Sequence, residues 1–350
     1  MNLRKLGWTA NREAEWNKAS PWGRPARVSA QWRNAYDVWT EHGECRATAT
    51  GALRHSGESL PVVGDWVDLE GGAASDGRIH GTLRRKSLLR RRAVGRRTEA
   101  QLIAANLDTV FIVTAHDGDL SLRRLDRYVT AVWDSGATPV VVVNKTDLAS
   151  DEERVRAEIE ERCPGVSVHG VSAVHGGGLD ALSRYLATGQ TVAMVGSSGV
   201  GKTTLLSRLA VLELRTLALG VDGRGQHTTT TRQMYRLPSD AWLIDTPGMR
   251  ELGLWAADEA LDASFSEVES LVERCRFSDC QHVSEPGCAV LAALEEGELS
   301  DDRFESYHKL QRELEHDAAR FADGLTRSRN RKKKRAFARM CRARTKAKGR

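Results

Sequence analysis

The strongest indication of the fold of this 350-residue chain is the stretch Gly196-Ser197-Ser198-Gly199-Val200-Gly201-Lys202-Thr203. It fits the pattern G-x-x-x-x-G-K-[ST], follows the apolar run Thr191–Val195 and precedes an expected helix over Lys202–Ala210. Glycines let backbone N–H groups approach phosphates without Cβ clashes, and a helix N-terminus adds partial positive charge. We therefore expect a phosphate-binding loop, in which Lys202 reaches the β- and γ-phosphates, Thr203 ligates Mg²⁺ and Thr204 follows in the same site.

Strands and helices alternate on both sides of this loop. The expected strands are Leu107–Thr114, Pro139–Val143, Val166–Val171, Thr191–Val195 and Ala241–Ile244. The expected helices span 122–132, with Ser121 as the N-cap, and Asp151–Arg162. This alternation predicts a multidomain α/β protein with a mostly parallel sheet.

A second motif, Asn144-Lys145-Thr146-Asp147, comes directly after the expected strand Pro139–Val143. The carboxylate of Asp147 can accept both the N1–H and the N2–H₂ of guanine, whereas adenine offers no such pair of donors. Asn144 and Lys145 would brace the loop and cover the base. A second loop, containing Ser172 and Ala173, matches one that supports the guanine. Alone, the tetrapeptide would be explained as a turn before a helix; together with the phosphate loop it predicts a GTP or GDP site.

Two further segments have the spacing of loops that sense the γ-phosphate. Asp245-Thr246-Pro247-Gly248 fits D-x-x-G, so that Asp245 would hold Mg²⁺ through water and the Gly248 N–H would contact the γ-phosphate. The loop 223–230 lies between this motif and the phosphate loop. One of its threonines would be a second hydroxyl ligand of Mg²⁺, and we favour Thr229.

The residue that orients the attacking water differs from that of Ras-like GTPases. Met249 follows D-x-x-G, where those enzymes carry a glutamine. We expect His227, in the loop 223–230, to take this catalytic role together with Lys202. The alternative is that His227 is a structural histidine.

The order of the motifs is unusual, because N-K-x-D precedes the phosphate loop instead of following D-x-x-G. The same sheet would then be built from a circularly permuted chain, which is tolerated where the original termini lie close together. The chain would leave the GTPase domain straight after Gly248. We hypothesise that loss of the γ-phosphate moves the C-terminal domain directly.

The sequence before the α/β pattern is rich in short strands. Five of them within about 60 residues predict an OB-fold β-barrel, a common binder of oligonucleotides. They are Ala26–Trp32, Ala35–Thr40, Glu44–Leu53, Trp66–Leu69 and Arg78–Leu83. The expected domains are an irregular arm (1–25), the OB-fold (26–98), the permuted GTPase domain (99–252), a helical zinc-binding domain (253–325) and a basic tail (326–350).

Four metal-ligating residues crowd together near the C-terminus, as Cys275-x₄-Cys280-x-His282-x₅-Cys288. Three thiolates and one imidazole suit a closed tetrahedral Zn²⁺ site with a structural role, since four protein ligands leave no open position. The alternative is a set of buried cysteines with an incidental histidine. The remaining cysteines do not form a disulfide framework, which favours a reducing cytoplasm.

Charge is distributed unevenly along the chain. Residues 327–350 contain 13 basic residues and no acidic one, whereas 101–326 contain 21 basic and 36 acidic. The run Arg84–Arg97 adds eight basic residues without an acidic one. This layout indicates a polyanionic partner contacted by the two ends. Six of the nine tryptophans lie in the first 66 residues, where some could stack on RNA bases, although Trp32 and Trp66 are expected in the core. No segment is apolar enough to span a membrane or to be a secretory signal.

These motifs together resemble the ribosome small-subunit-dependent GTPase family, RsgA/YjeQ, over roughly residues 26–320. The stretches Val63–Val67 and Gly225–Thr230 are similar to that family's as well. The resemblance implies an OB-fold, a permuted GTPase domain and a zinc domain that bind the 30S subunit and its 16S rRNA. It also implies a role in late 30S maturation, with subunit-stimulated GTP hydrolysis in which His227 takes part. We expect a cytoplasmic monomer.

Two functions of different classes stay open at this point. The first is a GTPase that acts on the ribosomal particle. The second is an RNA-binding assembly scaffold with a slow guanine-nucleotide sensor, which Met249 favours. A DNA-binding protein that uses the basic tail is a weaker third option. The stimulation of turnover by 30S particles distinguishes the first two.

Overall fold

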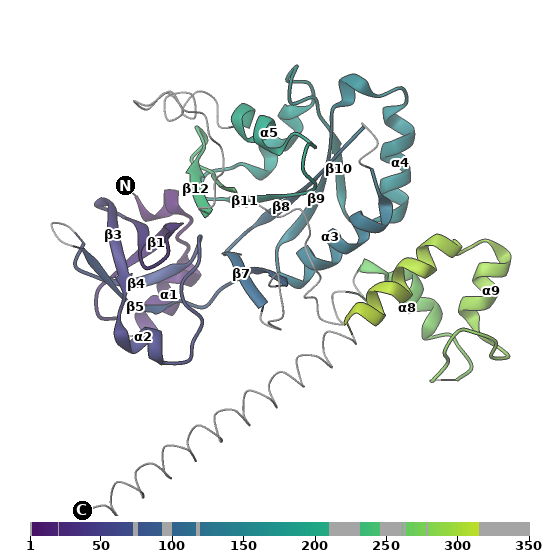
Figure 1. Cartoon of the computed structure of the whole chain (residues 1–350), viewed down its shortest axis with the longest axis horizontal. Helices are drawn as coiled ribbons and strands as arrows, with labels where there is room; N and C mark the ends of the chain where they lie inside the picture. The colour runs from purple at the N-terminus through teal and green to yellow at the C-terminus, as the bar shows by residue number, and fades with distance from the viewer. Residues whose placement is uncertain are drawn as a thin grey trace, which may run out of the picture.

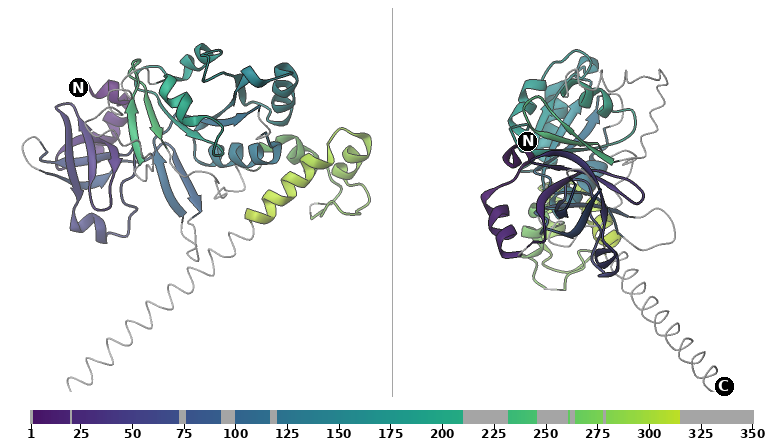
Figure 2. Two further views of the ribbon diagram at one scale, coloured as in Figure 1. Left: turned by 45° about the horizontal axis from the view of Figure 1, so that its top comes forward. Right: turned by 90° about the vertical axis from the view of Figure 1, so that its left-hand side faces the viewer.

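The computed structural model describes residues 2–19, 21–72, 76–92, 100–116, 120–209, 232–245, 261, 264–277 and 279–314. In these ranges the chain forms a β-barrel, an α/β part and a small helical domain (Figure 1). The barrel and the helical domain lie at opposite ends of the α/β part (Figures 1 and 2). The α/β part therefore contacts both of the others.

The barrel has five strands and is closed by pairing between its first and fourth. They are β1 (Arg24–Gln31), β2 (Tyr36–Thr40), β3 (Gly43–Ala49), β4 (Trp66–Glu70) and β5 (Gly77–Thr82). Their order is β1-β2-β3-β5-β4, with β3 and β5 parallel. Val28, Val38, Leu69 and Ile79 fill the interior and are fully buried. All five expected strands are therefore present.

Two details of the barrel differ from the expectation. The third strand stops early, because Thr50 accepts a hydrogen bond from the Leu53 N–H at 3.3 Å and starts α2 (Gly51–His55). Trp66 is buried as expected, but Trp32 lies just beyond the end of β1 and is 42% exposed. Its Nε1 donates to Asp37 at 2.6 Å, and Arg46 lies over its ring.

The first 25 residues were expected to be irregular, which is wrong for most of them: they contain η1 (Leu3–Leu6) and α1 (Ala10–Ala19). α1 has no apolar stripe, because one of its two buried residues is the arginine Arg12 and the other is Trp16. Trp8 packs edge-on against Trp66 of the barrel with 4.7 Å between ring centroids. The Trp242 Nε1 of the α/β part donates to the Lys5 carbonyl at 2.6 Å. The arm therefore joins the barrel to the α/β part.

The α/β part contains the predicted mostly parallel sheet, in the order β10-β9-β8-β11-β13-β12. Its strands are β8 (Thr109–Ala115), β9 (Thr138–Asn144), β10 (Ser167–Gly170), β11 (Thr191–Val195), β12 (Arg232–Arg236) and β13 (Trp242–Asp245). The five predicted strands are confirmed; only β12 is antiparallel. The sheet is buried on both faces, as expected for runs such as Val140–Val143.

Helices cover both faces of this sheet. α3 (Leu122–Asp134) and α4 (Glu152–Arg162) pack on one face, with η3 (Leu179–Tyr185) and α5 (Lys202–Leu209) on the other. Asp151 caps α4 by accepting from the Arg154 N–H at 3.0 Å. Ser121 stands at the expected N-cap of α3 but makes no side-chain cap bond.

Three strands were not predicted; two of them, β6 (Leu88–Arg92) and β12, are mostly polar, and the third, β7 (Ala100–Ala105), is short and apolar. β6 lies within the arginine run and pairs with β7 in a hairpin that buries Leu89 and Ile103. β12 is mostly polar, yet it pairs with β1 as well as β13. This pairing joins the barrel and the α/β sheet edge to edge.

The helical domain contains α8 (Ser266–Val272), α9 (Ala289–Glu296) and a helix over 301–314. It docks on the α/β part through the carboxylate of Asp126 on α3, which has no exposed surface. Arg162 of α4 donates to it at 2.6 Å and Arg303 of the helical domain at 2.7 Å. Arg303 also donates to Glu267 at 2.6 Å, and Arg162 to Asp302 at 2.6 Å. Because each of these charged residues has an oppositely charged partner, the buried charges are compensated.

We predict that Asp126→Ala lowers the free energy of unfolding by about 3–5 kcal/mol, because it leaves two buried guanidinium groups without their shared carboxylate. Urea denaturation followed by tryptophan fluorescence measures this. The matched control is Glu153→Ala on the exposed side of α4, with an expected change within about 0.5 kcal/mol. Equal stabilities of the two variants would contradict a docking role for Asp126.

Candidate functional site

The phosphate loop connects β11 to α5 in a conformation that its glycines permit. Gly196 has φ 144° and Gly201 has φ 92°. A Cβ on Gly196 would lie 2.1 Å from the Val113 carbonyl oxygen of β8. The Lys202 Nζ donates to the carbonyls of Gly196 and Ser197 at 2.8 and 2.5 Å, so the loop curls around the ammonium group. Thr203 and Thr204 are exposed in the first turn of α5.

Asn144 connects this loop to the predicted guanine loops. Its side chain is buried, and its Nδ2 donates to the Val200 carbonyl at 2.7 Å. Its Oδ1 accepts from the Ala173 N–H at 3.0 Å. The Asn144 side chain fits only because residue 201 is a glycine, since a Cβ there would lie 2.3 Å from the Asn144 Nδ2. One amide thus holds together segments around 144, 173 and 200.

Asp147 lies in the same loop, which turns at Lys145 with φ 62°. Its Oδ1 accepts from the Ser172 hydroxyl at 2.5 Å, and this hydrogen bond holds the pKa of Asp147 below its usual value. The group is therefore ionised at neutral pH, as an acceptor for two guanine donors must be. Ser172 was expected to support the base; in the structure it contacts the carboxylate that would bind the base.

Asp245 is the last residue of β13, which runs parallel to β11 with Ala193 opposite Ile244. The backbone of Asp245 therefore lies at the edge of the sheet where the phosphate loop begins. Three other predicted site residues, His227, Thr229 and Gly248, lie outside the described residues.

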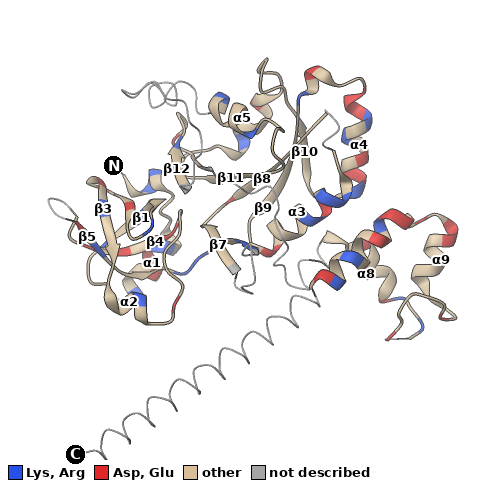
Figure 3. Cartoon of the chain, in the orientation of Figure 1, with Lys and Arg blue, Asp and Glu red and all other residues tan. Residues whose placement is uncertain are grey.

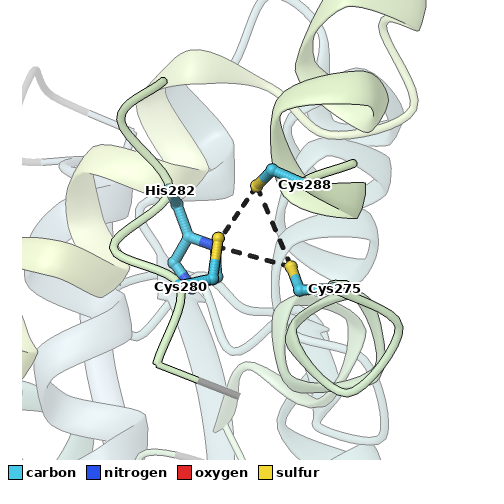
Figure 4. A group of neighbouring side chains, drawn as sticks. All are labelled: Cys275, Cys280, His282 and Cys288. Carbon is cyan, nitrogen blue, oxygen red and sulfur yellow. Dashed lines mark hydrogen bonds between the residues drawn. The ribbon is translucent and has the colours of Figure 1, made fainter. Parts of the chain in front are cut away.

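The four predicted metal ligands gather in the helical domain (Figure 4). Their three Sγ atoms and the His282 Nδ1 all lie within 4.8 Å of one another. The His282 Nδ1 is 3.6 Å from the Cys275 Sγ and 3.4 Å from the Cys288 Sγ, and the two sulfurs are 3.8 Å apart. Ligands at about 2.0–2.3 Å from a tetrahedral ion have edges of about 3.5–3.8 Å. The residues present therefore fit a four-coordinate metal.

Glu285 organises the turn between two of these ligands and was not predicted. Its carboxylate accepts from the N–H groups of Gln281, Val283 and Ser284 at 2.9, 2.8 and 3.0 Å. These backbone hydrogen bonds lower its pKa to about 2. They fix the chain on both sides of His282, whose φ is 57°. In the sequence, this role is indicated only by the position of Glu285 between the two ligands His282 and Cys288.

Comparison with known proteins agrees with this geometry. The RsgA GTPase family model matches residues 82–255. The small ribosomal subunit biogenesis GTPase RsgA 2 of Lactiplantibacillus plantarum is 44% identical over 321 residues, which cover 90% of each chain. The chain belongs to the RsgA GTPase family. The small ribosomal subunit biogenesis GTPase RsgA of Opitutus terrae is 42% identical over 344 residues, covering 94% of each chain.

Solved structures show the same fold. The crystal structure of YjeQ from Thermotoga maritima matches with a TM-score of 0.64 and 31% identity, covering 83% of this chain and 98% of that one. The crystal structure of YloQ, a circularly permuted GTPase, matches with a TM-score of 0.61 at 23% identity, covering 84% and 95%. The predicted circular permutation is confirmed. As an RsgA GTPase, the chain is a GTP hydrolase. None of its described helices is long and apolar enough to cross a membrane.

We predict that Asn144→Ala weakens GTP binding by this RsgA GTPase about 10- to 100-fold. The substitution removes both hydrogen bonds of the buried amide, at about 1–3 kcal/mol for each partner left unpaired. Titration with a fluorescent GDP or GTP analogue measures the affinity. The exposed Asn34→Ala serves as the control, and similar affinities of the two variants would contradict the bracing role.

Proposed function

We propose that this GTPase binds the 30S ribosomal subunit and acts late in small-subunit maturation, hydrolysing GTP to GDP and phosphate with subunit-stimulated turnover. The observation that carries the proposal is the Asn144 side chain, which joins a phosphate loop to a guanine loop. The relatives that share this chain's length are named small ribosomal subunit biogenesis GTPases, which supports the biological role.

The nucleotide would bind along the edge of the sheet where β9, β11 and β13 end. The phosphates would meet the N–H groups of residues 196–204 and the N–H of Gly248, and guanine would meet Asp147 in the loop 144–147 beside Ser172 and Ala173. Thr203, Thr229 and Asp245 would hold Mg²⁺, which neutralises charge on the phosphates when bound. Lys202 would stabilise the transferred phosphoryl group, and His227 would orient the attacking water.

The helical domain would hold one Zn²⁺ ion through Cys275, Cys280, His282 and Cys288. The closed donor set supports a structural role, because no position is left for water or substrate. The proposed domain boundaries remain 1–25, 26–98, 99–252, 253–325 and 326–350.

We interpret the barrel as an OB-fold that contacts 16S rRNA together with the basic tail. Two exposed tryptophans support this. Trp22 is 83% exposed and stacks on His80 with 5.8 Å between ring centroids, and Trp32 is 42% exposed beneath Arg46. Aromatic faces on a barrel surface can stack on bases of single-stranded RNA. The protein would act as a cytoplasmic monomer.

The second candidate function is an RNA-binding scaffold with a slow guanine-nucleotide sensor. Met249 supports it, because a thioether cannot orient the attacking water as the glutamine of Ras does. The scaffold and the enzyme differ in whether the ribosomal subunit stimulates turnover.

We predict that purified 30S subunits raise the kcat for GTP by orders of magnitude. His227→Ala should lower this stimulated kcat by about 100-fold or more, with nucleotide affinity unchanged, because it removes only the group that orients water. Phosphate release over time, with and without subunits, measures both effects. Binding of subunits without a rise in turnover would favour the scaffold instead.

We predict that Glu285→Ala lowers Zn²⁺ affinity about 10- to 100-fold, as for other residues that position metal ligands. The three N–H groups around His282 would lose their shared acceptor. Competition with a chromophoric chelator measures the affinity. Glu296→Ala, an exposed glutamate at the end of α9, is the control and should match the wild type.

A further inference from the structure

A basic cleft lies where the arm, the barrel and the α/β part meet. It has a volume of about 310 Å³, and its lining includes Thr9 and Arg12 of the arm and Arg84, Arg85 and Lys86 of the segment that leaves the barrel. We call it the junction cleft. A cavity of about 30 Å³ behind it shares Thr9, Arg12 and Lys86 and reaches the buried Arg27. Figure 3 shows the Lys and Arg residues in the segment between the barrel and β7.

Positive charge exceeds negative charge in and around this cleft. Five cations, Arg12, Arg27, Arg84, Arg85 and Lys86, face three carboxylates, Glu15, Asp65 and Asp108. Arg12 pairs with Glu15 at 3.0 Å, Arg85 with Asp65 at 2.7 Å, and Lys86 with Asp108. Two positive charges are therefore left without a carboxylate of their own.

One of these two cations is buried and the other is exposed. Arg27 is 2% exposed and donates to neutral groups only: the Leu6 carbonyl, the Thr191 hydroxyl at 2.7 Å and the Gly64 carbonyl at 3.4 Å. Arg84 is exposed on the lining of the cleft, and its guanidinium makes no ion pair within the described part of the chain. The Arg84 backbone is fixed, because its carbonyl accepts from the Arg12 guanidinium.

The cations also oppose one another. The pKa of Arg27 is lowered to about 10, because burial and the charge of Arg12 together outweigh the attraction of Asp108 and Asp65. Burial likewise lowers the pKa of Lys86; its ion pair with Asp108 opposes this effect, and the charges of Arg27 and Arg12 add to it. A bound anion would relieve both the repulsion and the shortage of carboxylates.

We propose that the junction cleft binds a phosphate group of an RNA backbone, with Arg84 as its main contact, Lys86 exposed beside it and Arg12 buried next to them. The inference rests on the proposed function, in which RNA is a partner. A backbone phosphate fits better than a free anion, because basic residues continue along the chain beyond the cleft and could follow further phosphates. They continue from Arg84–Lys86 into β6, which carries Arg90 and Arg91. The arm and the segment 84–86 line the cleft, and the small cavity behind it adds residues of the barrel and the α/β part.

The test measures binding of the full-length protein, loaded with a non-hydrolysable GTP analogue, to 30S subunits at 50–300 mM KCl. Arg84→Gln should reduce the slope of log K against log [KCl] by about 0.9, the value for one lost phosphate contact, and affinity at 0.1 M KCl by about five- to ten-fold. Arg84→Lys, which keeps the charge, should restore the slope. Arg154→Gln on α4, whose side chain is 77% exposed, removes the same charge elsewhere and should leave slope and affinity unchanged.

Turnover of GTP without subunits should be the same for all four proteins, which shows that each is folded. If wild type binds 30S subunits and Arg84→Gln matches Arg154→Gln, the cleft proposal is wrong and the proposed function stands. If wild type does not bind the subunits, the proposed function itself fails and the cleft proposal fails with it. Inorganic phosphate is the second probe. If 10 mM phosphate raises the Tm of wild type but not of Arg84→Gln while the salt slopes agree, the cleft is a small-anion site and the RNA assignment is overturned.

Discussion

The nucleotide site depends on one buried amide. Asn144 connects three loops that the sequence separates by up to 56 residues, and its partners are backbone groups rather than side chains. A backbone partner fixes the path of the chain, so the distance between the phosphate loop and the guanine loop is set before nucleotide binds. Gly201 is required by the same contact, because any Cβ there would collide with the amide. The order of the motifs can therefore be permuted without disturbing the site, since parallel strands end at the same edge in either order.

The permutation determines what each end of the GTPase domain is attached to. β11 begins at Thr191, whose hydroxyl accepts from Arg27 of the barrel and whose N–H donates to Asp108 at 2.8 Å. Five residues later it ends at the phosphate loop. β12 pairs with β1, and the arm contacts both Trp66 and Trp242. Barrel, arm and phosphate loop are thus connected by short, buried contacts, and the barrel has a fixed position relative to the nucleotide.

The sequence predicted the parts of this structure that follow from local pattern. Val140–Val143 and Thr191–Val195 are apolar because both faces of their strands are buried, and loop motifs follow them directly. The arm was missed because its buried residues, Trp8, Arg12 and Trp16, have helical spacing but include an arginine, so they do not form an apolar pattern. β12 was missed because its stability comes from pairing with β1 and β13 rather than from its own side chains. Trp32 was expected in the core because it is a large apolar residue. It lies beyond the end of β1, however, where its side chain contacts Asp37 and Arg46 near the surface.

The contacts of Asp126 constrain how the helical domain can respond to the nucleotide. The chain enters this domain soon after β13, so loss of the γ-phosphate could act on it through the intervening segment. Detaching the domain would separate Arg303 from Asp126 and Asp302 from Arg162, and would expose these charged groups to water. A rotation that keeps the Asp126 contacts avoids this separation, and it also keeps the metal cluster joined to α3. If the helical domain responds to the nucleotide, these contacts favour a movement together with α3 over its release.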